Sequence, residues 1–118
     1  MKKTNYKTGL AAEALCRMAL RIKGYGIVAS RYRGYCGEVD IIAVRGKALA
    51  LIEVKARPSL DLAAEALSAA QRLRLESAAD EFLSRHPGFC KHDMRFDMML
   101  VAPWRWPVHI VNAWQAKR

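Results

Sequence analysis

The chain has 118 residues, of which 53% are hydrophobic and 26% are charged, and 20 Lys and Arg against 11 Asp and Glu give a net charge of +9. This composition excludes a disordered chain, and the length suits a single domain over residues 1–118. A charge of this size on a small domain favours a polyanionic partner, either nucleic acid or an anionic membrane, with a basic but inert surface as the alternative.

The cysteines and the apolar runs indicate the compartment. Cys16, Cys36 and Cys90 are odd in number, widely spaced and form no CxxC pair. They therefore argue for a reducing compartment and against both a disulfide framework and a zinc site. No run approaches transmembrane length, and Glu13 and Arg17 interrupt the apolar region that a signal peptide needs. We expect a cytoplasmic protein with no membrane partner.

Residues 8–23 have the apolar spacing of an amphipathic helix, which Gly24 ends. Glu13, taken alone, predicts a surface ion pair with Arg17 worth only about 0.3–0.5 kcal/mol. A short strand is expected over residues 27–32, followed by a basic, glycine-containing link. The expected buried stripe of the helix is Ala11, Ala14, Leu15, Met18 and Ile22.

Residues 38–55 predict a β-hairpin, because two runs rich in Val, Ile, Leu and Ala are separated at Gly46. Glycine at the first position of a two-residue loop suits a type II′ turn, where that residue needs φ > 0. This turn pairs Arg45 with Ala48. The expected core face of the hairpin is Val39, Ile41, Ala43, Ala50, Ile52 and Val54.

The other face of the hairpin carries a polar cluster. Counting outward from the turn places Asp40 opposite Glu53, and Glu38 opposite Lys55, so the four side chains share a face. Two carboxylates this close either share a proton, with one pKa raised, or hold a cation. Carboxylate oxygens suit Mg²⁺, which takes one or two protein carboxylates and often substrate phosphates. The cluster therefore resembles the site of a metal-assisted phosphodiesterase.

The C-terminal half predicts a helix and two strands. Residues 60–67 fit a loop with a helical turn, and Ser68 has the capping-box spacing that starts a helix ending at His86. Strands are expected over residues 94–101 and 108–111, joined by a turn. The expected buried stripe of the helix is Leu75, Ala78, Ala79, Phe82 and Leu83.

The turn between those strands contains Trp104 and Trp106 on either side of Arg105. Aromatic side chains beside basic ones are a common platform for stacking bases. Tryptophans more often cover the edge of a core, and we expect that role here. His109 alternates with apolar neighbours and is expected to be structural.

The pattern Asp40…Glu53-Val-Lys55 resembles the PD-(D/E)xK motif of the restriction-endonuclease-like superfamily. More closely, the chain resembles the YraN-like family of small bacterial proteins, which is related to archaeal Holliday junction resolvases. A bare D…ExK is common by chance, whereas GEVDIIA followed at this distance by IEVKAR is specific. The resemblance runs from about Gly9 to Ala116 and rests on Gly9…Glu13, GEVDIIA (37–43), IEVKAR (52–57), Gln71-Arg-Leu and RFDMMLV (95–101).

This resemblance implies an α/β fold with a restriction-endonuclease-like core, a central mixed β-sheet flanked by helices in the order αβββαββ. It also implies that Asp40 and Glu53 are catalytic ligands of Mg²⁺ or Mn²⁺, with the Val54 carbonyl as a further candidate. Lys55 would position or activate the attacking water or offset charge on the phosphorane. Glu13 would be an accessory catalytic acid, and Glu38 would support the metal ligands.

Nucleic acid, expected to be DNA, is the implied partner. Ala70 stands where the family usually has Lys, and an Asn of the family is replaced near Arg31, so phosphate contacts or substrate preference differ. Junction resolvases of this fold act as symmetric dimers, so a homodimer is compatible, but the sequence shows no interface signature. The expected phosphate contacts are Arg31, Arg33, Arg57, Gln71, Arg72 and Arg74, although a solvated face is the alternative for the three in the second helix.

Three hypotheses about function remain open at this point. The leading one is a Mg²⁺-dependent endonuclease-like protein that hydrolyses phosphodiester bonds, with branched DNA among the candidate substrates. The second is a nucleic-acid-binding module that keeps the fold without cleaving, because fold does not guarantee chemistry. The third is a protein–protein adaptor in which the cluster is a structural ion-pair network.

Overall fold

The computed structural model describes residues 6–35 and 37–116, with the side chains of residues 6–8 left out. Cys36 therefore lies outside the described residues, and Cys16 and Cys90 are free thiols. The elements, in chain order, are α1 (Tyr6–Ile22), β1 (Gly26–Arg33), β2 (Glu38–Arg45), β3 (Ala48–Ala56), α2 (Leu60–Ala64), α3 (Ala69–Arg85), the 3₁₀ helix η1 (Pro87–Phe89), β4 (Asp93–Val101) and β5 (Val108–Trp114).

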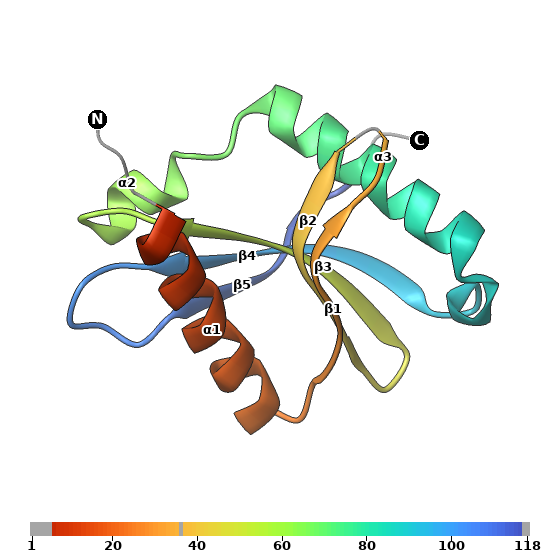
Figure 1. The fold of residues 1–118 in the computed structure, drawn as a ribbon, viewed down its shortest axis with the longest axis horizontal. Coiled ribbons are helices and arrows are strands. Elements are labelled where there is room, and N and C mark those ends of the chain that lie inside the picture. Colours follow the sequence, from red (N-terminus) through yellow and green to blue (C-terminus); the bar gives the residue numbers. More distant parts are fainter. Residues whose placement is uncertain (1–5, 36, 117–118) are drawn as a thin grey trace.

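The strands form one mixed sheet in the order β1-β2-β3-β4-β5, with β3 and β4 parallel and the other neighbours antiparallel. Helices α1 and α3 lie on either side of this sheet (Figure 1). The parallel pair needs a crossover, and the segment that contains α2 and α3 supplies it. The predicted α/β fold with a mixed sheet is confirmed, and α2 and η1 are additions to the predicted order αβββαββ.

The central hairpin has the predicted turn and register, but its ladder is shorter than expected. Gly46 has φ +59°, and Arg45 pairs with Ala48. The pairing continues as far as Ile41 and Ile52 and then stops. Beyond that point β2 and β3 diverge, β2 toward α3 and β3 toward α2 (Figure 1). This divergence opens the sheet where the polar cluster was expected.

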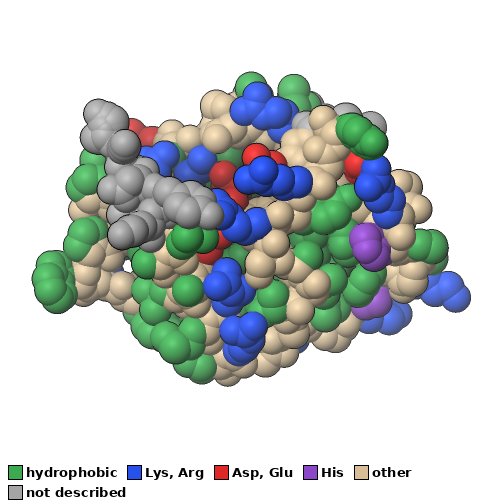
Figure 2. All heavy atoms as spheres, in the orientation of Figure 1, with side chains coloured by type: hydrophobic (Ala, Val, Ile, Leu, Met, Phe, Trp, Pro, Cys, Tyr) green, Lys and Arg blue, Asp and Glu red, His purple; other side chains and the backbone are tan. Residues whose placement is uncertain are grey.

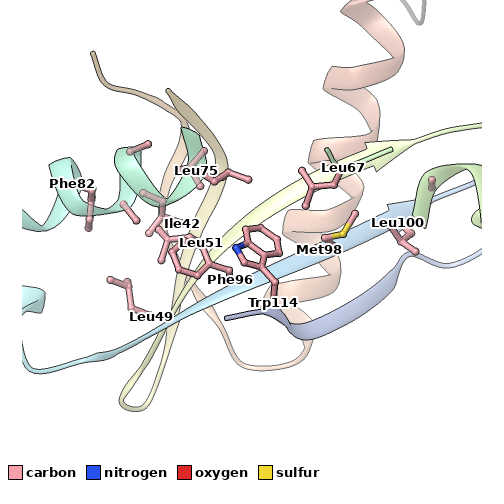
Figure 3. Packing of buried hydrophobic residues seen from close by; sticks show 14 residues of the cluster. Ile42, Leu49, Leu51, Leu67, Leu75, Phe82, Phe96, Met98, Leu100 and Trp114 are labelled. Atoms are coloured by element: carbon pink, nitrogen blue, oxygen red, sulfur yellow. The ribbon is translucent and has the colours of Figure 1, made fainter. Parts of the chain in front are cut away.

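The prediction of a single core face on this hairpin is wrong, because both faces of the sheet are apolar and buried. Ile41, Ala43, Ala50 and Ile52 pack against α1. On the opposite face, the cluster under α3 contains Val39, Ile42, Leu49, Leu51, Leu75, Ala78, Ala79, Phe82, Phe96, Met98 and Trp114 (Figure 3). Val39 was expected on the face of Ile41, and it lies on the other because the alternation breaks where β2 leaves the ladder.

The buried face of α1 also differs from the prediction. Met18 and Ile22 belong to the expected stripe but are exposed, as are Ala11 and Ala14. The reason is that α1 is apolar on more than one side, so periodicity alone does not choose a face. The side that packs on the sheet carries small residues, which let the helix approach closely; it consists of Ala12, Cys16, Ala19 and Leu20, with Glu13 beside them.

Helix α3 matches its prediction closely. Ser68 caps it through a capping box with Gln71, and its C-cap is His86. Four residues of the predicted stripe are buried and the fifth, Leu83, packs against them. This agreement follows from local signals, because the cap and the helical spacing lie within the segment itself.

The C-terminal strands are longer than predicted, and β5 continues to Trp114. Trp114 packs on Phe96 with ring centroids 5.3 Å apart, so this tryptophan covers the edge of the core. Trp104 and Trp106 do not: both are exposed. The expectation that they cover the core is wrong.

Candidate functional site

A hollow lies where β2 and β3 diverge beside α3. Figure 2 shows acidic side chains in the middle of one face of the molecule, bordered by Lys and Arg side chains. The strands supply carboxylates and α3 supplies polar and basic groups, so the hollow is polar. Its lining consists of Gly37, Glu38, Asp40, Glu53, Gln71, Arg74 and Leu75.

Asp40 and Glu53 meet in this hollow as the hairpin register predicted. Both side chains line it, and each changes the pKa of the other. Oδ2 of Asp40 accepts a hydrogen bond from the backbone N–H of Val54, at 2.8 Å. A side-chain oxygen therefore accepts from the β3 backbone at the point where the ladder has ended, which holds the Asp40 carboxylate at the fork between the strands.

Lys55 completes the cluster. Its Nζ lies 3.1 Å from Oε2 of Glu53, and the residue is only 8% exposed. Among the described residues neither Asp40 nor Glu53 is paired with an arginine. One lysine is therefore the counter-charge for two partly buried carboxyl groups.

This excess of carboxyl groups over positive charge changes the pKa values of Asp40 and Glu53. Burial, together with the neighbouring Asp40, raises the pKa of Glu53 to about 8. Burial also raises the pKa of Asp40, although the hydrogen bond from Val54 opposes the shift. The site therefore favours holding a proton between the two carboxyl groups at neutral pH, and a cation is the chemical alternative to that proton.

Glu13 approaches the same region from α1. It is 6% exposed, and the Nε of Arg31 lies 3.4 Å from its Oε1. Burial raises the pKa of Glu13, and the charge of Asp40 adds to this shift. Arg31 has φ +55°, an uncommon conformation for a non-glycine residue. The weak surface pair of Glu13 with Arg17 is therefore the wrong description of this carboxylate.

Glu38 lines the hollow but does not face Lys55 as predicted. It is exposed, and its Oε1 lies 3.7 Å from the Nε of Arg33, its neighbour on β1. The predicted opposition fails because the β2–β3 ladder ends before it reaches Glu38. Its charge still acts on the acidic pair, since it raises the pKa of Asp40.

The residues predicted to contact phosphate are only partly brought together. Gln71 and Arg74 line the hollow from α3. Arg31 and Arg33 are on β1 and are ion-paired with Glu13 and Glu38, as described above. Arg57 donates to the carbonyl of Ala56 at 2.7 Å, and Arg72 lies 5.5 Å from the ring centre of Trp114.

Gly34 and Gly37, in the link between β1 and β2, pack closely against α3. This contact positions the start of β2. A Cβ on Gly37 would lie 2.6 Å from the carbonyl oxygen of Arg74, and one on Gly34 would lie 2.2 Å from a carboxylate oxygen of Glu81. Glu81 also accepts a hydrogen bond from the backbone N–H of Tyr35 at 2.8 Å. Glycine therefore permits the close contact that brings β2 and α3 together at the hollow.

The donor set fits a hard divalent cation. Asp40 and Glu53 offer carboxylate oxygens in a site that lacks charge balance, and such oxygens suit Mg²⁺ or Mn²⁺. No group of three or more His, Cys, Asp or Glu is placed to hold a metal within residues 6–35 and 37–116. A cation here would therefore take two protein carboxylates and complete its coordination with water or substrate, as Mg²⁺ commonly does.

A second polar network was missed by the sequence analysis. Asp97 on β4 is fully buried and accepts hydrogen bonds from the Arg95 guanidinium, the His109 ring and the Asn112 N–H, at 2.7–2.9 Å. Burial alone would raise the pKa of Asp97, but the hydrogen bonds from His109 and Arg95 hold it below its ordinary value. An available signal was the spacing of Arg95 and Asp97, which places both on one face of a strand. His109 has the structural role expected of it.

The fold and this site define an α/β protein whose mixed sheet opens at a central hairpin to hold two carboxylates and a lysine. No helix in the described part of the chain combines the length and apolarity needed to cross a membrane. Residues 12–101 match the model of Uncharacterised protein family UPF0102. The chain belongs to this family, which confirms the resemblance to YraN-like proteins.

Bacterial relatives agree over nearly the whole chain. A UPF0102 protein of Parvibaculum lavamentivorans is 50% identical over 110 residues, which cover 93% of this chain and 83% of the relative. Relatives from a Chelativorans species and from Mesorhizobium japonicum are 46% and 47% identical over 112 residues, covering 95% of this chain and 90% of each relative.

Proposed function

We propose that this protein is a metal-dependent nuclease that hydrolyses phosphodiester bonds in nucleic acid, with DNA as the expected substrate. The observation that supports this most directly is the convergence of Asp40, Glu53 and Lys55 at the fork between β2 and β3. Two carboxyl groups with raised pKa and a single lysine form a site in which a cation can take the place of the shared proton. The basic surface around the hollow suits a polyanion.

Asp40 and Glu53 would hold Mg²⁺ or Mn²⁺ in this hollow. A divalent ion supplies a Lewis acid for a phosphoryl oxygen and lowers the pKa of a bound water. Asp40 is suited to its role because the Val54 N–H fixes one of its oxygens and leaves the other for a ligand. Glu53 would release its proton to serve in this way.

Lys55 would act on the reacting phosphate and the water. Its ammonium group is held beside the Glu53 carboxylate by burial and by the ion pair between them. A fixed positive charge in a partly water-excluded site stabilises negative charge that develops on the phosphorane. Gln71 and Arg74 line the hollow from α3 and would contact flanking phosphates.

The test is a cleavage panel of branched, single-stranded and duplex DNA with Mg²⁺ or Mn²⁺, comparing the wild type with Lys55→Ala. We expect cleavage by the wild type and a loss of about 10²-fold or more in the variant, since removing one group that stabilises transition-state charge commonly costs that much. DNA binding should be retained. Lys47→Ala, an exposed lysine at the other end of the hairpin, is the matched control and should cleave normally.

The competing hypotheses predict different results. If the protein bound DNA but cleaved no substrate with either Mg²⁺ or Mn²⁺, the result would support a non-cleaving module. If neither DNA nor metal affected the protein, only the adaptor would remain. Cleavage that persisted undiminished in Lys55→Ala would contradict the role assigned to this residue.

A further inference from the structure

The turn between β4 and β5 displays two tryptophan rings that the core does not use. Trp104 is fully exposed (101%) and Trp106 is 55% exposed. Neither belongs to the apolar clusters on the two faces of the sheet. Trp104 also has φ +65°, in the left-handed region that bulky residues rarely adopt. Exposing two large aromatic rings in this way does not stabilise the fold.

The charge around these rings favours an anionic partner. Arg105 lies between them and is exposed. After Asp97 the sequence contains no Asp or Glu up to its end at residue 118. A second copy of the chain would bring another net charge of +9 to this surface. Nucleic acid instead offers aromatic faces for the indoles and phosphates for the arginine.

The turn between β4 and β5 follows the C-terminal end of β4, which lies beside the end of β3 that carries Lys55. β3 and β4 are parallel, and Lys55 pairs with Leu100. Trp104 follows Leu100 by four residues, each spanning at most ~3.6 Å, and paired strands lie ~4.8 Å apart. The Cα atoms of Lys55 and Trp104 are therefore within about 20 Å of each other. Figure 1 shows the end of β3 and the β4–β5 turn on the same side of the molecule.

We infer that Trp104 and Trp106 form a platform on which unpaired bases stack, so that the substrate carries a single-stranded segment beside the bond to be cleaved. This inference rests on the proposed function, because it concerns the substrate of the same site. It selects branched, gapped or single-stranded nucleic acid over continuous duplex, since bases stacked within a duplex cannot lie on a protein side chain.

The test compares two oligomers of equal length and charge, an oligothymidylate and its abasic counterpart, bound to the full-length metal-free protein. We expect the wild type to bind the base-bearing oligomer at least about fivefold more tightly, because one stacked base commonly contributes that much. In Trp104→Ala/Trp106→Ala the ratio of the two affinities, base-bearing over abasic, should fall to about one, and the affinity for the abasic oligomer should be unchanged. Trp104→Phe/Trp106→Phe should restore most of the ratio, since phenyl rings also stack.

Other outcomes would overturn the inference in distinguishable ways. Equal binding of both oligomers by the wild type, with metal-dependent cleavage intact, would refute the platform and leave the nuclease proposal standing. Failure to bind either oligomer would refute nucleic-acid binding and the platform with it. A wild-type dimer that became a monomer in Trp104→Ala/Trp106→Ala, with a binding ratio already near one, would assign these rings to self-association.

Discussion

Asp40 and Glu53 place two carboxyl groups in one partly buried site, and the stability of the metal-free protein depends on whether both are charged. Because the pKa of Glu53 is raised to about 8 in the native state, from an ordinary value of 4.5, the native protein holds a proton that the unfolded chain has released. The free energy of unfolding therefore decreases as pH rises from about 4.5 to about 8, as far as this group is concerned.

Asp40→Asn tests this directly. Asparagine keeps an oxygen that accepts from the Val54 N–H but removes the charge that opposes ionisation of Glu53. We expect the metal-free variant to be more stable than the wild type at pH 9 by about 1 kcal/mol or more, since each pKa unit corresponds to about 1.4 kcal/mol. At pH 5, where Glu53 is largely protonated in the native state, the difference should be small. Urea unfolding with a chelator at both pH values measures the effect.

Metal binding gives the same variant a second readout. Mg²⁺ or Mn²⁺ should raise the thermal midpoint of the wild type, because a ligand that binds only the native state stabilises it by mass action. Asp40→Asn should abolish this rise, and Glu65→Gln, which changes an exposed carboxylate, should leave it intact. A rise that survived in Asp40→Asn would show that the ion binds elsewhere.

At the scale of elements, the site depends on how the start of β2 is held against α3. The ladder to β3 ends at Ile41, so the segment that carries Asp40 is fixed by the link from β1 and by α3 instead. At Gly37 a side chain would meet the backbone of α3 rather than the flexible end of a side chain. The geometry of the hollow is therefore sensitive to this glycine.

Gly37→Ala should both destabilise the protein and impair the site. The added Cβ would lie 2.6 Å from the carbonyl oxygen of Arg74, so the link or α3 must shift. Overpacking of this kind commonly costs about 1–3 kcal/mol, and we expect a further loss of metal binding or cleavage at temperatures where the variant remains folded. Gly88→Ala, where the added Cβ meets nothing within 4 Å, is the control. Unchanged stability in Gly37→Ala would contradict this close contact.

At the scale of the whole molecule, the net charge of +9 governs association. The acidic hollow lies among Lys and Arg side chains (Figure 2), so phosphates are attracted to its rim. Such attraction depends on the release of counterions from the nucleic acid and therefore weakens as salt is added. Such attraction would carry no sequence preference, so the selectivity of the proposed nuclease would come from the shape of its substrate or from the exposed tryptophans.

DNA binding should therefore weaken steeply with salt. We expect log K to fall linearly with log [salt], and Arg74→Gln, which changes a residue lining the hollow, to reduce the slope by about 1. Arg85→Gln should leave the slope unchanged, because Arg85 is ion-paired with Glu81. Anisotropy titrations at several salt concentrations give both slopes. Binding that did not respond to salt would contradict an electrostatic interface.

Much of the fold and the centre of the site followed from local patterns in the sequence. The Gly46 turn sets the register of the hairpin, and counting that register past the end of the ladder places Asp40 beside Glu53, where both line the hollow. The Ser68 capping box likewise starts α3 at the predicted position. These features were predictable because turn chemistry, capping and alternation act over a few residues.

Features that depend on how the elements come together were decided only by the tertiary structure. The buried stripe predicted for α1 was wrong because the helix is apolar on more than one side, and the sheet selected the side with small residues. The fork that separates Glu38 from Lys55, the buried network around Asp97 and the exposure of Trp104 likewise arise from contacts or gaps between distant segments. Local periodicity determined which residues alternate, whereas packing of helices on both faces of a twisted sheet determined which of them are buried.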